Sequence, residues 1–136
     1  MLNKEGLTLL RGVTIALLII QSIGAGIWWG ILWRVPEMRR LFLAPEAPIS
    51  TLFSFSLPDA ILILMGGLVS AWGIAQRKTW AGVALSLHTG AIVYAGLYAL
   101  ALPLFSGGAW LGCVLMLPSM ICLPLLLWKL YTEKAL

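Results

Sequence analysis

Short polar segments divide the chain into four long apolar runs. The runs cover about residues 7–33, 57–76, 80–102 and 108–130. A helix needs roughly 20 residues to cross the hydrocarbon of a bilayer, and each run meets that length. We therefore predict a single domain, residues 1–136, with four transmembrane helices. Because the second and third connections are short, neighbouring helices are expected to run antiparallel in an up-down bundle.

The composition supports lipid as the solvent around most of this chain. Apolar residues make up 61% of the sequence and charged residues only 10%, whereas soluble domains carry roughly 25% charged residues. So few charges do not cover a water-facing surface. The first run is also too long for the apolar core of a signal peptide, so it is expected to remain as a span. The predicted fold class is an all-α integral membrane protein.

The basic residues predict an orientation in the membrane. Those on the side of the two termini and the second connection are Lys4, Arg11, Arg77, Lys78, Lys129 and Lys134. Those on the opposite side are Arg34, Arg39 and Arg40. The excess of six over three favours cytoplasmic N- and C-termini in the plasma (inner) membrane. Because the charges lie in gaps between spans and form no stripe on one face, no nucleic-acid partner is expected.

Small residues recur every three or four positions on three of the expected helices. The stripes are Ser22, Gly26 and Gly30, then Gly66, Ser70 and Gly73, then Ser86 and Gly90. Small side chains at this spacing let helix backbones approach closely in lipid. They predict close packing inside the bundle, or contacts between copies in a homo-oligomer. Seven tryptophans lie near the span ends, where they are interpreted as anchors at the membrane interfaces.

The first connection, from Arg34 to Phe53, is the one long loop. It mixes charges and prolines with apolar residues, so it is too polar to span and too apolar to be free in water. Pro36 and Pro45 bracket a stretch, about 36–43, that is predicted to form a short interfacial helix or turn. This segment either caps the bundle or serves as a lid over a site that opens outward.

Asp59 is the only acidic residue inside an apolar run. Ser56 precedes it by three residues, and the pattern S-x-x-D ahead of an apolar run is typical of a helix N-terminal capping box. Pro58 fits the first turn of such a helix. The capping interpretation needs no ligand. The alternative is a carboxylate at the mouth of the bundle that binds a cation or moves a proton.

His88 is the only histidine, and it lies deep in the third span. Gln21 lies at a similar depth in the first span, so its side chain, or alternatively a serine hydroxyl, is expected to pair with the imidazole. Such a pair is either polar packing between helices or a functional group. The functional interpretation is a proton relay, or a hydrogen bond to the polar head of an apolar ligand such as a quinone. Tyr94 and Tyr98 share one helix face farther out.

Several cofactor sites are not expected from this sequence. A single histidine disfavours a bis-histidine haem, and the ligand sets of di-iron and zinc sites are missing. Cys113 and Cys122 form no C-x-x-C motif, and nine residues along a helix separate them by about 13 Å, too far for a disulfide. They are interpreted as small packing residues. We predict neither a metal nor a bound cofactor.

Two functional hypotheses follow. The first is a membrane protein without a catalytic centre, which acts as an accessory subunit of a larger complex or binds an apolar, lipid- or quinone-like molecule. The second is a small transporter or lipid-modifying enzyme. Its outward-facing site would combine Glu37, Asp59 and Arg34 with the two tyrosines, with His88 beneath them. Because no catalytic constellation is evident, the first hypothesis is favoured.

Overall fold

The computed structural model describes residues 3–136, and the described chain is all helical apart from short connections. In chain order the elements are α1 (Lys4–Arg34), α2 (Pro36–Arg39), the 3₁₀ turn η1 (Arg40–Phe42), α3 (Ile49–Ser54), α4 (Ser56–Pro58), the π-helical segment η2 (Asp59–Met65), α5 (Gly66–Ala75), α6 (Ala81–Ser106) and α7 (Trp110–Thr132). The elements from α3 to α5 follow one another as a single apolar helix, Ile49–Ala75. Four helices are thus long and apolar enough to cross a membrane.

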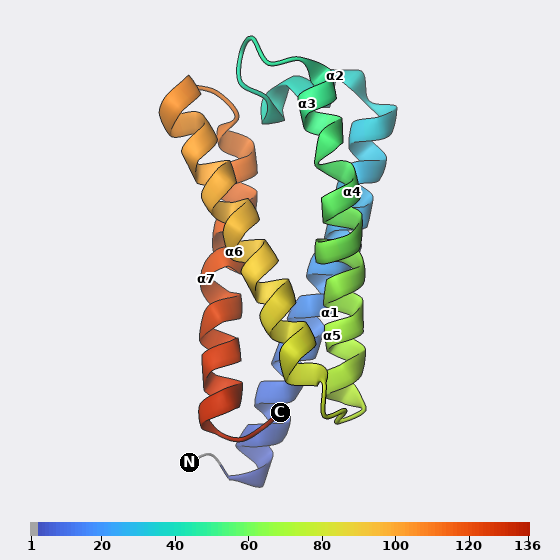
Figure 1. Cartoon of the computed structure of the whole chain (residues 1–136), viewed down its shortest axis with the longest axis vertical. Helices are drawn as coiled ribbons and strands as arrows, with labels where there is room; N and C mark the ends of the chain where they lie inside the picture. The colour runs from blue at the N-terminus through green and yellow to red at the C-terminus, as the bar shows by residue number, and fades with distance from the viewer. Residues whose placement is uncertain (1–2) are drawn as a thin grey trace.

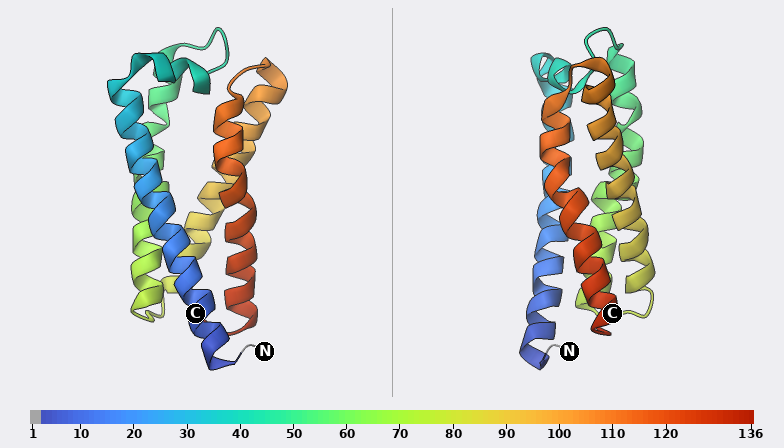
Figure 2. Two further views of the ribbon diagram at one scale, coloured as in Figure 1. Left: turned by 180° about the vertical axis from the view of Figure 1, so that it is seen from behind. Right: turned by 90° about the vertical axis from the view of Figure 1, so that its left-hand side faces the viewer.

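The four helices pack antiparallel, as the sequence predicts, and the protein is an integral membrane protein of the four-helix-bundle type (Figure 1). Both termini and the connection between α5 and α6 lie at one end, which we call the terminal end. The connection between α1 and α3, residues 35–48, lies at the other end, and we call it the lid. Seen from behind and from the side, the lid covers one end of the bundle (Figure 2).

The second long helix begins at Ile49, eight residues before the predicted start. The capping interpretation of Ser56 and Asp59 is therefore wrong, because both residues lie inside a continuing helix. The Ser56 hydroxyl donates to the carbonyl oxygen of Phe53 at 2.7 Å. Pro58 has no N–H for a carbonyl in the preceding turn, and the π-helical segment η2 follows it directly. In this segment the Gly66 N–H reaches back five residues to Ile61.

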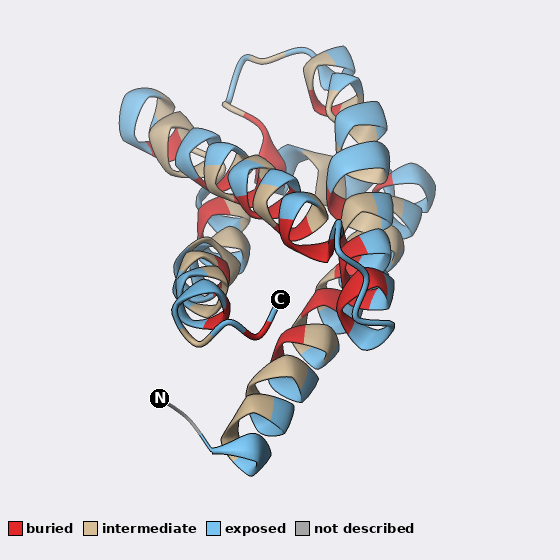
Figure 3. Ribbon diagram, turned by 60° about the horizontal axis from the view of Figure 1, so that its bottom comes forward, coloured by how far each residue is buried: buried red, intermediate tan, exposed pale blue. Residues whose placement is uncertain are grey.

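The terminal half of the bundle has a densely packed core. Four leucines from three helices are fully buried there: Leu18, Leu85, Leu123 and Leu130. Viewed from the terminal end, buried segments line the inside of the bundle, and exposed segments face outward toward lipid (Figure 3). The C-terminal tail closes this end, where Nε of Arg11 donates to the carbonyl oxygen of Ala135 at 2.7 Å.

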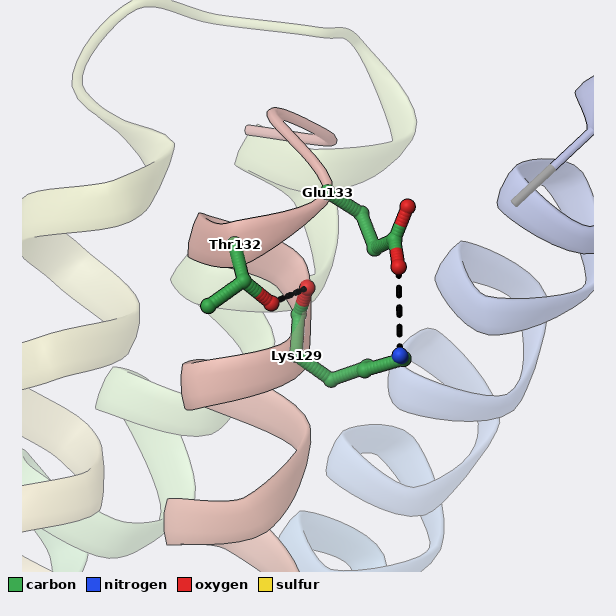
Figure 4. Close-up of polar contacts among 3 residues, drawn as sticks. All are labelled: Lys129, Thr132 and Glu133. Atoms are coloured by element: carbon green, nitrogen blue, oxygen red, sulfur yellow. Dashed lines mark hydrogen bonds and ion pairs between the residues drawn. The ribbon is translucent and has the colours of Figure 1, made fainter. Parts of the chain in front are cut away.

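The last turn of α7 carries a local ion pair at the terminal end. Nζ of Lys129 lies 3.1 Å from Oε1 of Glu133, one helical turn away (Figure 4). The Thr132 hydroxyl donates to the carbonyl oxygen of Lys129 at 3.1 Å. A cation in the last turn also complements the negative end of the helix dipole.

Only some of the predicted small-residue stripes mediate close packing. Gly67, beside the second stripe, lies against Ser22 of α1 and His88 of α6. A β-carbon at this position would collide with the Ser22 hydroxyl and make a tight contact with the His88 ring. Gly30 and Gly90, in contrast, face open space. The first and second helices therefore approach closely along part of the predicted stripes, while other small residues face outward.

The lid contains the predicted short helical segment, as α2 followed by η1. Arg39 fixes it to the end of α1: Nε donates to the carbonyl oxygen of Leu32 at 2.7 Å, and Nη2 donates to that of Trp33 at 2.9 Å. These bonds satisfy carbonyls that the helix end leaves without partners. A small apolar cluster joins Phe42 and Leu43 of the lid to Leu32 of α1 and Leu52 of α3.

Candidate functional site

A cleft of about 620 Å³ lies beneath the lid, between two pairs of helices. Residues of α1 and of the helix Ile49–Ala75 form one side, residues of α6 and α7 form the other, and lid residues such as Phe42 and Leu43 close the end. The two pairs diverge toward the lid end in Figure 1 and in the left view of Figure 2. On α1 the lining extends from Gln21 to Ile31, a depth of about 15 Å at 1.5 Å per residue.

Small side chains leave this space open. The α6 wall includes Ala91, Ala95 and Ala99, which recur every four residues and so share one helix face. Gly24 and Ala25 of α1 also line the cleft. These residues are not part of the small-residue stripes predicted above, which contain glycine and serine. The regular alanine spacing on α6 was the available signal.

Among the described residues 3–136, Asp59 supplies the only carboxylate in the lining of the cleft. Its Oδ2 accepts a hydrogen bond from Nε1 of Trp29 at 3.1 Å, so α1 and the second long helix together hold the acidic group in place. Asp59 is the first residue of η2. A π-helical turn changes the rotational phase of the residues that follow it relative to an α-helix. The helix irregularity after Pro58 therefore lies at the position where the carboxylate meets the cleft.

Aromatic side chains surround the part of the cleft nearest the lid. The rings of Trp28 and Phe42 meet edge to face with centroids 3.8 Å apart, and those of Phe55 and Tyr98 lie 4.9 Å apart. Trp28 and Trp29 both line the cleft. Two of the seven tryptophans are therefore part of the site, in addition to any role as interface anchors.

His88 lies behind the cleft wall and does not line it. The ring is 2% exposed. Its Nδ1 lies 2.9 Å from the carbonyl oxygen of Leu62, and its Nε2 lies 3.3 Å from Oε1 of Gln21. The structure thus pairs His88 with Gln21, as the sequence predicts, and adds a bond to the backbone of η2. The two residues that bond to the imidazole, Gln21 and Leu62, both line the cleft.

The carbonyl of Leu62 fixes the protonation of one ring nitrogen. A carbonyl only accepts, so Nδ1 of His88 must carry a proton and donate it. If the ring is neutral, Nε2 has a lone pair and needs a donor, which the amide NH₂ of Gln21 supplies after a flip. If the ring is protonated, Nε2 donates to Oε1 of Gln21. In both states the two ring nitrogens are satisfied by the protein, as expected for polar packing between helices.

Two buried hydroxyl groups near His88 lack hydrogen-bond partners. Among residues 3–136 these are Oγ of Ser22 and Oγ1 of Thr89. Both side chains are almost completely buried. A buried polar group without a partner is destabilising. The middle of the bundle therefore contains two buried hydroxyl groups, of Ser22 and Thr89, in addition to the His88–Gln21 pair.

The structure divides the predicted site residues into three groups. Gln21, Asp59, Tyr94 and Tyr98 line the cleft. His88 lies behind its wall. Glu37 and Arg34 are exposed near the lid and are not part of the lining. Within residues 3–136, no three His, Cys, Asp or Glu side chains gather as potential metal ligands.

The two cysteines have different surroundings. Both are free; Cys113 is buried and Cys122 is exposed on the outside of α7. The interpretation as packing residues therefore holds for Cys113 and is wrong for Cys122, because α7 turns that position away from the bundle interior.

No family model matches this chain, and neither a curated protein nor a solved structure matches it. The chemistry of the cleft is therefore the basis for a functional interpretation.

Proposed function

We propose that this protein binds one amphiphile of the bilayer, with a polar head and an apolar chain, in the cleft beneath the lid. The observation that carries the proposal is the cleft itself, with a volume of about 620 Å³. Sites for small molecules typically measure roughly 300–1,000 Å³ and combine apolar walls with a few fixed polar groups. This cleft has that composition, with apolar walls and polar side chains at Asp59 and Gln21.

The arrangement of polar groups suggests how the amphiphile lies. The Asp59–Trp29 pair is near the lid, and Gln21 is at the deep end. The head group would contact Asp59, and the chain would extend toward Gln21. The depth of about 15 Å equals half of the roughly 30 Å hydrocarbon core. A cleft of that depth fits the acyl chain of a lipid from one leaflet.

The basic residues support an orientation with cytoplasmic termini in the plasma membrane. In that orientation the lid faces outward, and the cleft lies in the outer leaflet. Reporter fusions at Asn3 and Leu136 test this orientation. Cytoplasmic activity of both fusions is expected, and activity on the opposite side would place the cleft in the inner leaflet.

The cleft favours ligand binding over the other hypotheses. A role only as an accessory subunit needs an apolar surface for a partner, and it leaves an internal cleft without a purpose. The transporter or enzyme hypothesis combines Glu37 and Arg34 with Asp59, yet only Asp59 reaches the lining. Binding of an amphiphile requires only residues that share the cleft.

A matched pair of substitutions on α6 tests the proposal. Ala95→Trp places an indole in the cleft, whereas Val83→Trp adds the same group at a position that is 62% exposed on the same helix. Native mass spectrometry from mild detergent should show one bound amphiphile per chain for the original protein and for Val83→Trp, and none for Ala95→Trp. Equal occupancy in all three proteins would contradict binding in the cleft.

A further inference from the structure

The cleft contains a carboxyl group that has no basic side chain of the cleft beside it. In the part of the chain that the structure describes, its lining includes Asp59 but no Lys, Arg or His. The hydrogen bond from Trp29 stabilises the carboxylate without neutralising it. Within residues 3–136 no ion pair includes Asp59. An ionised carboxylate without a counter-charge is unfavourable in a medium of low dielectric constant. A cationic ligand would stabilise the ionised form and gain binding energy there.

The arginines of the lid have other partners. Arg39 donates to the carbonyl oxygens of Leu32 and Trp33 and lies over the ring of Phe53 at 5.1 Å. Arg40 donates to the carbonyl oxygen of Ala47 at 3.1 Å. Their positions stabilise the lid and leave the carboxylate inside the cleft to a ligand.

The surroundings of Asp59 suit a cation better than a neutral polar group. Aromatic residues of the lining (Trp28, Trp29, Phe42, Phe55, Tyr94 and Tyr98) come from α1, the lid, α3 to α4 and α6. Aromatic faces attract cations such as alkylammonium groups, and the attraction increases when water is excluded. A carboxylate that shares a cleft with several aromatic rings is therefore a chemical match for an ammonium head group.

We propose that the cleft selects amphiphiles with a cationic, ammonium-type head group, which lies between Asp59 and the aromatic side chains. This inference rests on the proposed function, because it names the ligand class of the same cleft. The apolar walls toward Gln21 take the hydrocarbon chain and give affinity without regard to charge. Asp59 adds the preference for the cation.

Three probes with the same chain separate charge from hydrophobicity. The protein in a nonionic detergent is titrated with tetradecyltrimethylammonium, with its uncharged carbon isostere, and with tetradecanol, and binding is followed by tryptophan fluorescence and native mass spectrometry. The ammonium compound should bind at least about tenfold more tightly than either neutral probe. Equal affinity for all three probes would overturn the proposed selectivity.

Substitutions of two acidic residues at the same end of the molecule provide the control. Asp59→Asn should abolish the tenfold preference for the ammonium probe over the two neutral probes. Glu37→Gln removes the same charge from an exposed position outside the cleft and should keep the preference. Asp59→Glu retains the carboxylate and should keep most of the preference for the ammonium probe. This variant shows that a substitution at position 59 does not by itself destroy the cleft. A preference that persists in Asp59→Asn would contradict the assignment of Asp59.

Failure of this inference differs from failure of the proposed function. If the ligand class is wrong, the neutral probes still bind, and Ala95→Trp still blocks them. If the cleft binds no amphiphile, no probe shows an affinity that depends on Ala95→Trp.

Discussion

The terminal half and the lid half of this bundle are similarly apolar, yet only one of them is filled. In the terminal half, large side chains such as Leu85, Leu123 and Leu130 face one another and are fully buried. In the lid half, one face of α6 carries Ala91, Ala95 and Ala99, and the two helix pairs diverge around a cleft. The size of the side chains at facing positions therefore decides which half is a packed core and which is a site.

The surrounding lipid explains why the cleft in the lid half can stay open. In water, an apolar cleft would favour collapse of the helices onto each other, because burial of apolar surface drives packing. In a bilayer that force between helices is missing, and packing depends on van der Waals contact and hydrogen bonds. Helix pairs whose facing residues are small can therefore remain apart, with lipid or a ligand between them.

The largest effect on stability is expected from substitution of Gly67, where three helices meet. Gly67→Val would push against Ser22 and His88 and should lower the free energy of unfolding by about 3 kcal/mol, the upper part of the range for overpacked sites. Gly90→Val is the matched control, because a β-carbon there meets nothing within 4 Å. Unfolding in mixed detergent micelles measures both. Equal losses of stability in the two variants would contradict the close approach of three helices at Gly67.

The next largest effect on stability should come from the packed half, in a direct comparison with the same substitution in the cleft. Leu85→Ala, in the packed half, is expected to lower the free energy of unfolding by about 2 kcal/mol. This is the low end of the range for soluble cores, because lipid rather than water is the reference for the exposed chain. Leu115→Ala, which lines the cleft and is 55% exposed, should change it by less than about 0.5 kcal/mol. Similar values at both sites would contradict the distinction between core and cleft.

A smaller effect is expected at the border of the halves, where His88 pairs with Gln21. His88→Leu should lower the free energy of unfolding by about 1 kcal/mol, in the range of polar contacts between membrane helices. A double-mutant cycle with Gln21→Leu isolates the pair and should give a coupling of about 0.5 kcal/mol or more. Additive losses would show that the two side chains are stabilised by other partners.

The smallest effect should come from the terminal end, where Lys129 pairs with Glu133. Lys129→Gln is expected to change the free energy of unfolding by no more than about 0.5 kcal/mol, because the pair joins neighbouring turns of one helix and the Lys129 side chain is 45% exposed. The change should decrease as salt is raised. A loss of several kcal/mol that does not depend on salt would instead assign Lys129 to the packed core.

Much of the fold follows from the sequence, because apolar run length and short connections alone predict four antiparallel spans. The short helix of the lid could also be predicted, from its flanking prolines, and so could the pairing of His88 with Gln21, from their similar depth. The start of the second helix at Ile49 could not be predicted. Ser56 and Asp59 imitate a capping box, and only the fold shows that the chain is already helical before them.

The cleft was not predictable from the sequence for a different reason. Small residues bring helices together or leave a gap according to the rotation of each helix, which local sequence does not determine. Gly67 contacts its neighbours, while Ala91, Ala95 and Ala99 face the cleft. The placement of Asp59 beside Trp29 depends on the same rotation and on the π-helical segment.

Photocrosslinking tests the central claim, occupancy of the cleft by one amphiphile, most directly. A tetradecylammonium probe with a diazirine in the middle of its chain is bound to the protein and activated, and the labelled residues are mapped by mass spectrometry. We expect saturable labelling of Gly24, Ala91 and Ala95, with loss of label when unmodified probe is added in excess. Label spread over outward-facing positions such as Val83 and Leu87, without saturation, would contradict it.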